Sequence, residues 1–388
     1  MIPLTALSAR ARLAPESGIL AVSNHGRTKE GLIPLWAGEG DQPTPAFITD
    51  AAAAALAGGE TFYTWPRGIP PLREALVRYH YRHFGKKYSA DEFIVCGSGM
   101  QAVQIAIDAT CGAGDEAIFI APAWPNFAGA LLVAGCSPVP VGLDRTENGW
   151  SLDLGRLEAA IGPRTRAIFV NSPGNPTGWT AGRDTLKAIL DLARRHGLWI
   201  IADEIYALFH YADGRAPSFM DIMEEDERIL FVNTFSKNWA MTGWRIGWLK
   251  VPTGFAQVFE NLVQYSTSGV PQFLQRGCIA ALDEGDAYLA AQVERARRAR
   301  DLVCGSLARS NRARIAPPPG AFYLMFSIDG LDDSMRVALD IVDHANVGLA
   351  PGIAFGPEGE GSLRLCFHRD LGQLEEACDR LVNWVAKA

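Results

Sequence analysis

The sequence predicts an α/β protein with a large domain built on a mostly parallel sheet and a second, smaller α+β domain. Two observations lead to this expectation. Short apolar runs alternate with amphipathic helical segments through the middle of the chain, and such alternation is typical of a parallel sheet with helices on both faces. The last hundred residues change to a long charged helix followed by strands and a closing helix. We place the large domain at residues 36–284 and the small domain at residues 1–35 and 285–388.

Five strands of the parallel sheet are expected, each apolar, four or five residues long, and mostly bounded by Gly, Pro, Asn or Asp. Amphipathic helices are expected between them, for example at Gln101–Ala109 and at Asp184–His196, where Gly197 is a stop signal. The expected strands are Phe93–Cys96, Ala117–Ala121, Ala167–Asn171, Leu198–Ala202 and Ile229–Asn233.

The C-terminal part predicts a helix near Asp286–Arg309, strands near Phe322–Ile328 and Ser362–Phe367, and a final helix. The N-terminal thirty-odd residues lack a core of their own. We therefore expect them to pack on the small domain.

Length, charge and cysteine usage narrow the class of protein. At about 150 residues per domain, 388 residues suit two domains. The 36 basic and 43 acidic residues give a formal net charge of −7, which argues against a nucleic-acid partner. We find neither a membrane-length apolar stretch nor a signal peptide, so no membrane partner is expected. The seven cysteines contain no CxxC pair, and we expect a cytoplasmic protein.

Polar residues follow each expected strand. Because ligands of such sheets bind outside the carboxyl ends of the strands, these residues are expected to share one site. The segments in question are Gly97-Ser98-Gly99-Met100, Pro122-Ala123-Trp124, Ser172-Pro173-Gly174-Asn175-Pro176-Thr177-Gly178, Asp203-Glu204-Ile205-Tyr206 and Thr234-Phe235-Ser236-Lys237.

The residue types in these segments suit one cofactor. The Ser98-Gly99 turn before a helix offers backbone N–H groups to a phosphate. Lys237 follows an apolar strand, and a desolvated amine can form a Schiff base. Asp203 ends an apolar strand, where a carboxylate needs a partner such as a protonated pyridine nitrogen. With Trp124 as a stacking indole, these residues predict a site for pyridoxal 5'-phosphate.

The motifs around these residues resemble those of the fold-type I aminotransferases of classes I and II, which include aspartate and aromatic amino-acid aminotransferases. The match runs from about residue 34 to 368 in the family's order and spacing. It implies the fold-type I architecture, with a mostly parallel sheet of the seven-stranded type. The matching motifs are Tyr63-Thr64-x-x-x-Gly68-Ile69-Pro70-x-Leu72-Arg73, Ser98-Gly99-x-Gln101-Ala102, Pro122-x-Trp124, Asn171-x-Pro173-x-Asn175-Pro176-Thr177-Gly178, Asp203-Glu204-x-Tyr206, Ser236-Lys237-x-x-x-Met241-Thr242-Gly243-Trp244-Arg245-Ile246-Gly247, Pro319-x-Ala321-Phe322-Tyr323 and Arg364-Leu365-x-Phe367.

The resemblance also implies roles for the residues that would face the cofactor. Lys237 would form the Schiff base and move the substrate proton, and Asp203 would keep the ring nitrogen protonated. Tyr206 and Asn175 would hydrogen-bond the ring oxygen, and Trp124 would stack on the ring. The phosphate would be held by Ser98, the backbone of Gly99 and Met100, Thr234, Ser236, Arg245 and, from the second subunit of a homodimer with shared active sites, Tyr63.

On the substrate side, the resemblance implies that Arg364 binds the α-carboxylate beside Gly38 and Asn175. Two residues depart from the family's pattern. Met100 stands where some members carry threonine or lysine, and its apolar thioether favours neutral or aromatic donors over strictly acidic ones. Gly40 stands where proline is common, and its backbone freedom is expected to loosen the loop 38–41.

Two other charged groups are interpreted as solvated helix faces. His80 and His83 are three residues apart with no third ligand nearby, so we predict no metal site. The arginines at 295, 297, 298 and 300 alternate with alanines and acids in an acidic protein.

We therefore expect a pyridoxal-phosphate-dependent aminotransferase that moves the amino group of an L-amino acid to a 2-oxo acid by a ping-pong mechanism. A C–S β-lyase, an ACC-synthase-like enzyme or a racemase would share Lys237, Asp203 and Arg364, so these alternatives stay open. A non-catalytic effector-sensing domain is a remote alternative. It would need an attached DNA-binding module, and only about thirty residues precede the first matching motif.

Overall fold

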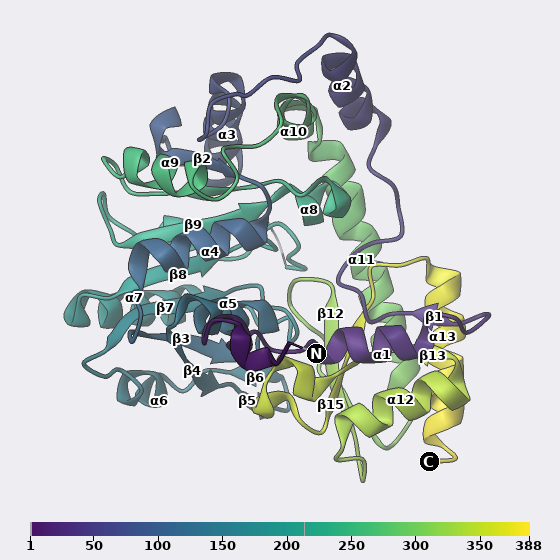
Figure 1. Ribbon diagram of the computed structural model, residues 1–388. Helices are drawn as coiled ribbons and strands as arrows, with labels where there is room; N and C mark the ends of the chain where they lie inside the picture. Colours follow the sequence, from purple (N-terminus) through teal and green to yellow (C-terminus); the bar gives the residue numbers. More distant parts are fainter. Residues whose placement is uncertain (1, 213) are drawn as a thin grey trace.

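The computed structural model describes residues 2–212 and 214–388 and is organised around two main β-sheets (Figure 1). The larger sheet has seven strands, of which only one runs antiparallel to its neighbours. That strand is β10. Across the sheet the strands are β2 (Phe93–Cys96), β10 (Gly247–Lys250), β9 (Ile229–Thr234), β8 (Trp199–Asp203), β7 (Thr165–Asn171), β3 (Glu116–Ala121) and β4 (Ser137–Gly142).

All five strands expected from the sequence lie in this sheet, with ends within two residues of the expected ones. Two further strands were not expected. β4 pairs only with β3 and contains Pro138 and Pro140, which an edge strand tolerates but which hide the strand pattern. β10 has only four residues and begins at Gly247, the last residue of a motif that we had interpreted as part of the site.

Helices cover both faces of the larger sheet. Consecutive residues of β8 point to opposite sides, so Ile200 and Ile201 belong to two different hydrophobic cores. Gly197 has φ 65° and ends the helix before β8, as expected. The helices are α2 (Ala46–Ala57), α3 (Pro70–Phe84), α4 (Gly99–Thr110), α5 (Pro125–Ala134), α6 (Leu154–Ala159), α7 (Arg183–His196), α8 (Phe235–Asn238), α9 (Ala256–Gln264) and α10 (Gln272–Glu284), and a hairpin of β5 (Asp144–Thr146) and β6 (Gly149–Ser151) lies beside them.

The smaller sheet is antiparallel and has its own hydrophobic core. Helix α11 (Asp286–Leu307) extends from α10 to the C-terminal helix and so runs beside both parts of the molecule (Figure 1). The strands are β11 (Ala313–Arg314), β12 (Tyr323–Ile328), β15 (Ser362–Cys366) and β14 (Ala350–Pro351), and the helices are α12 (Ser334–Ala345) and α13 (Leu371–Val385).

The N-terminal segment divides between the two parts. Helix α1 (Gly18–Gly26) packs on α12, and β1 (Ile33–Pro34) pairs in parallel with β13 (Val347–Gly348), as expected for the small-domain side. Before α1, however, Arg10 Nε donates to the carbonyl oxygen of Val133 in α5, at 2.7 Å. The domain boundaries themselves stay a prediction. Short 3₁₀ turns lie at Leu4–Ala6, Ala11–Leu13, Ala90–Glu92, Phe219–Asp221, Thr242–Trp244, Gly352–Phe355 and Pro357–Gly359.

The expected solvated face at His80 is wrong. His80 is fully buried, its Nε2 lies 3.2 Å from Trp248 Nε1, and burial lowers its pKa to about 3. His83 is partly buried and pairs with Asp286. The His80 ring packs among Tyr79, Phe84 and Phe93, so it is a histidine of the hydrophobic core. The face of α3 that carries it is turned toward the sheet rather than toward solvent.

The arginine group of α11 is only partly a solvated face. Arg298 is exposed, whereas Arg295 pairs with Asp41 and the Arg300 guanidinium lies 4.6 Å from the Tyr211 ring centre. Over residues 2–212 and 214–388, no cluster of three metal-ligating side chains is found, and no helix is long and apolar enough to cross a membrane.

Candidate active site

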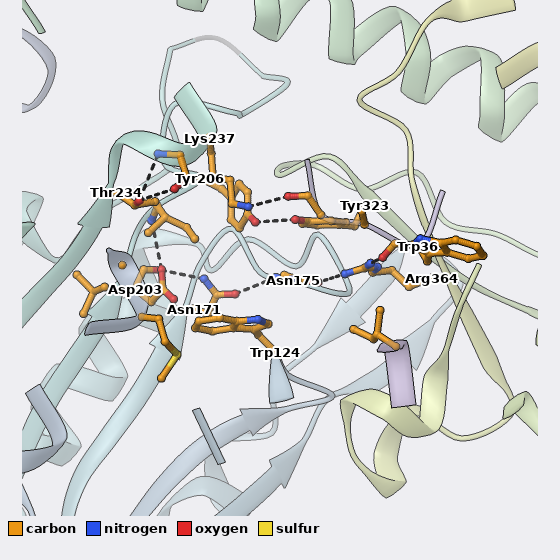
Figure 2. Close-up of a pocket in the computed structure, with 18 of the residues that line it drawn as sticks. Trp36, Trp124, Asn171, Asn175, Asp203, Tyr206, Thr234, Lys237, Tyr323 and Arg364 are labelled. Atoms are coloured by element: carbon orange, nitrogen blue, oxygen red, sulfur yellow. Dashed lines mark hydrogen bonds between the residues drawn. The ribbon is translucent and has the colours of Figure 1, made fainter. Parts of the chain in front are cut away.

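A cavity of about 250 Å³ lies at the carboxyl ends of β7, β8 and β9 and is closed on its other side by residues of the N-terminal segment and of the smaller sheet (Figure 2). It brings together twelve of the fourteen site residues expected from the sequence. These are Gly38, Gly99, Met100, Trp124, Asn175, Asp203, Tyr206, Thr234, Ser236, Lys237, Arg245 and Arg364.

Lys237 lies in the four-residue helix α8 directly after β9. Its Nζ donates to the carbonyl oxygen of Gly38 at 2.6 Å, and no acidic side chain of the described residues forms a salt bridge with it. Burial lowers the pKa of this amine to about 8. A minor fraction of Lys237, roughly 10–20% at neutral pH, is therefore neutral and nucleophilic, far more than for an unperturbed lysine.

Asp203 is the last residue of β8 and is only 2% exposed. Burial raises its pKa to about 7, while the nearby Lys237 and Asn171 act in the opposite direction. Asn171 ends the neighbouring strand, donates to the Asp203 carbonyl oxygen at 3.1 Å, and accepts from the Asn175 amide at 2.8 Å. Such a deeply buried carboxylate fits a ligand that brings a cationic nitrogen to it.

The N-terminus of α4 and the end of β9 provide groups that can hold an anion. Helix α4 begins at Gly99, where a Cβ would lie 3.2 Å from Thr234 Cβ, so a side chain here would crowd the approach to Thr234. Thr234 Oγ1 donates to Ser236 Oγ at 2.9 Å, and Arg245 also lines the cavity. Backbone N–H groups, hydroxyls and a guanidinium are donors that suit a phosphate.

Ser98 does not line the cavity. Its hydroxyl caps α4 by accepting from the Gln101 amide at 3.0 Å, so it supports the turn from behind. Its backbone has φ 151° and ψ 165°, a region that is costly for a residue with a side chain and that is often found at functional sites.

Arg364 lies on β15 at the far end of the cavity and is 2% exposed. Its Nη1 donates to Asn175 Oδ1 at 3.1 Å, its Nη2 donates to the Trp36 carbonyl oxygen, and its Nε has no partner. No salt bridge joins it to an acidic residue of the described chain. A buried guanidinium that lacks a carboxylate suits a ligand that supplies one.

Several residues of the cavity were missed as site residues. Tyr323 Oη lies 2.7 Å from Tyr206 Oη, and burial raises the pKa of both phenols. Tyr323 and Asn171 stood in the quoted motifs, which was the signal that could have identified them. Trp36 contributes a backbone carbonyl oxygen, for which side-chain chemistry gives no signal. Ile19, Ala37, Ile205 and Val232 also line the cavity.

Tyr63 lies outside this cavity and is 97% exposed, so within one chain it does not join the other site residues. Phe62, Trp65 and Tyr265 are also large exposed side chains. The role of Tyr63 in the site of a second subunit stays a prediction.

The segment 36–42 crosses the site and is held by several contacts, so the expected loosening at Gly40 stays a prediction. A Cβ at Gly40 would lie 2.7 Å from His368 Cδ2, so the imidazole fills the space beside this glycine. The segment is also held by the Asp41–Arg295 ion pair at 2.7 Å and by the bond from Gln292 to Gln42 at 2.8 Å.

Comparison with known proteins agrees with this geometry. An arginine–pyruvate transaminase of Pseudomonas aeruginosa is 34% identical, covering 92% of this chain and 91% of that protein. The solved structure of a Thermus thermophilus aspartate aminotransferase single mutant superposes with a TM-score of 0.91 at 33% identity, covering 99% of this chain and all of the other. An alanine aminotransferase of Pyrococcus furiosus has a TM-score of 0.92 at 27% identity, covering 98% and 100%. The family Aminotransferase class I and II matches residues 30–381, and the chain belongs to this family of fold-type I transaminases.

Proposed function

We propose that this aminotransferase uses pyridoxal 5'-phosphate, bound in the cavity that Lys237 and Asp203 line. The observation that carries the proposal is the pairing of a buried lysine of lowered pKa with a buried carboxylate beside the N-terminus of α4. Each of these features would be unfavourable in an empty protein core, and together they match one cofactor. When bound, the cofactor supplies an electron sink for the negative charge that develops at the substrate Cα.

The residues of this chain then divide the remaining work. Lys237 Nζ holds and returns the proton of the substrate Cα, for which a pKa of about 8 is well matched. Asp203 would stabilise a protonated ring nitrogen, and Tyr206 and Asn175 would donate to the ring oxygen. Trp124 would pack against the ring face. Gly99, Met100, Thr234, Ser236 and Arg245 would hold the phosphate, with Ser98 fixing the start of α4.

We propose that Arg364 binds the α-carboxylate of the amino acid and, in the second half of a ping-pong cycle, that of the 2-oxo acid. Its buried guanidinium with an unpartnered Nε supports this role. Binding both substrates through the same group explains why one site serves two half-reactions.

The proposed amino donors are L-amino acids with neutral or aromatic side chains. The lining of the cavity includes the apolar or aromatic side chains of Ile19, Met100, Trp124 and Tyr323. Within the described residues, its cationic lining consists of Lys237, Arg245 and Arg364, which the proposal already uses, so no lining cation is left for a second substrate carboxylate. The similar proteins carry names with basic, acidic and neutral donors, and this inference therefore rests on the lining of this chain.

We further propose a homodimer in which Tyr63 reaches the phosphate of the second subunit. Tyr63, Phe62, Trp65 and Tyr265 are all large exposed side chains, and this supports a surface that a second subunit covers. Residues 1–35 and 285–388 are proposed to close as a small domain over residues 36–284 and exclude water.

The absorption spectrum of the purified protein tests the function. A cofactor band should convert to the pyridoxamine form when a single amino acid is added without a 2-oxo acid, and the fastest amino acid identifies the donor class. Absence of the band in protein soaked with pyridoxal phosphate would contradict the cofactor assignment. A band that persists while pyruvate accumulates would indicate the C–S β-lyase instead.

A further inference from the structure

The segment 36–42 accepts hydrogen bonds from both ends of the proposed site. The Gly38 carbonyl oxygen accepts from Lys237 Nζ at 2.6 Å, and the Trp36 carbonyl oxygen accepts from Arg364. Backbone oxygens cannot adjust independently, so a shift of this segment displaces the lysine and the arginine together. Whatever fixes the segment therefore fixes the spacing between the two.

His368 is placed to do this. It follows β15 two residues after Cys366, is 6% exposed, and stacks on Phe322 with ring centres 5.0 Å apart and planes 19° apart. Phe209 meets the same ring edge-on at 5.5 Å. The imidazole is thus held from two sides, and Gly40 lies against its remaining edge.

The contact between Gly40 and His368 leaves no room for a side chain at position 40. A Cβ there would meet His368 Cδ2 at 2.7 Å and Nε2 at 3.2 Å. The glycine and the histidine therefore form a matched pair, in which a residue without a side chain makes room for a buried ring. A small cavity of about 10 Å³ lies beside them and is bordered by Lys237, Tyr288 and Gln292.

The charges around His368 favour a stable neutral ring. Burial lowers its pKa to about 4, and the neighbouring Arg295, Arg369 and Lys237 act in the same direction, while Asp41 acts in the other. The packing contact therefore does not change with protonation across the physiological pH range.

We propose that His368 is a positioning residue which, by packing against Gly40, fixes the segment 36–42 and so sets Lys237 and Arg364 at their working separation. The proposal rests on the proposed function of those two residues. In this proposal His368 does not contact the substrate or the cofactor. It acts only through the segment 36–42.

The contact itself is tested in the apoprotein by thermal unfolding. Gly40→Ala should lower the Tm by roughly 2–4 °C, because the new methyl group meets the imidazole. Adding His368→Ala should recover part of that loss, because the vacated space accepts the methyl group. Gly182→Ala is the matched control, since a Cβ at Gly182 has nothing within 4 Å. A neutral Gly40→Ala, or a double variant with simply additive losses, overturns the proposal.

The positioning role is tested in the holoenzyme. His368→Ala should raise the KM of both the amino acid and the 2-oxo acid about tenfold, with a smaller change in kcat. The reason is that the Arg364 guanidinium would no longer be held in position by the segment 36–42. The pH midpoint of the cofactor band should also move, and both effects should be partly reversed in the Gly40→Ala/His368→Ala double variant. A lower Tm with unchanged KM and band midpoint would reduce His368 to a structural residue and overturn the proposal. If the wild-type protein shows no cofactor band, the proposed function fails, and the apoprotein measurement still reports on the contact.

Discussion

The two ends of the cavity are built in different ways. At the Lys237 end, the groups follow consecutive parallel strands, and each is placed by the strand that it ends. At the Arg364 end, an antiparallel strand, the segment 36–42 and Tyr323 come together from distant parts of the sequence. The first end depends on local geometry repeated along one sheet edge, whereas the second depends on how two sheets and the N-terminal segment meet. Substitutions at the Lys237 end should therefore lower mainly kcat, whereas substitutions at the Arg364 end should raise mainly KM.

The largest effect should come from the Lys237 end. Lys237→Ala removes the only group at that end proposed to move the substrate proton, and we expect the transamination rate to fall by about 10⁴-fold or more. The measurement is the half-reaction with a single amino acid. Lys187→Ala, on the exposed surface of α7, is the control and should keep the wild-type rate. If the half-reaction rate of Lys237→Ala lay within tenfold of the wild-type rate, the proposed catalytic role of the Lys237 end would be contradicted.

Asp203→Asn should follow, with a loss of roughly 10²–10³-fold in kcat, because a neutral amide no longer stabilises positive charge on the ring nitrogen. The matched control is Glu204→Gln. Glu204 is equally buried, is bonded by Ser218 Oγ at 2.6 Å, and does not line the cavity. Single-turnover rates should separate the two variants. Equal losses in both would mean that burial of charge, rather than contact with the ring, accounts for the effect.

The same pair predicts how the stability of the apoprotein depends on pH. Burial raises the pKa of Asp203 from 3.8 to about 7 and that of Glu204 from 4.5 to about 7. Between these values the folded protein holds protons that the unfolded chain has released, so the stability should fall as the pH rises from about 4 to 7. Either variant should flatten this slope and stabilise the apoprotein at pH 8 by an amount on the order of a few kcal/mol. Urea unfolding from pH 4 to 8 measures the slope, and an unchanged slope in Asp203→Asn would contradict the buried-carboxylate account.

Arg364→Lys probes the other end. Lysine keeps the charge but loses the planar guanidinium that reaches both Asn175 and Trp36, and we expect KM to rise by roughly 10- to 150-fold, equivalent to about 1.5–3 kcal/mol. The kcat should change less than it does in Asp203→Asn. Steady-state kinetics with both substrates checks this split. A fall in kcat with an unchanged KM would show that Arg364 serves the chemical step rather than carboxylate binding.

The contrast between the two ends also explains what the sequence predicted. Lys237, Asp203 and Asn175 could be placed together because strand ends of a parallel sheet share one edge. Arg364 was identified only through the resemblance, since a lone arginine on a strand gives no local sign of its partners. Trp36 acts through its backbone, and the Gly40–His368 contact joins residues 328 positions apart, so neither could be derived from pattern or spacing. His80 was misplaced because three-residue spacing identifies a helix face and does not say whether that face is buried.

The smallest expected effect concerns the choice of amino donor. Met100 follows Gly99 at the start of α4 and lines the cavity with an apolar thioether. Met100→Lys would place a cation there, and it should shift the ratio of kcat/KM for aspartate over that for a neutral amino acid by about tenfold toward aspartate. Met100→Leu is the matched control, because it keeps the volume and the apolar character, and it should leave the ratio within about twofold. If Met100→Lys weakens both donors equally, the side chain of the donor lies elsewhere, and the partner subunit becomes the place to look for it.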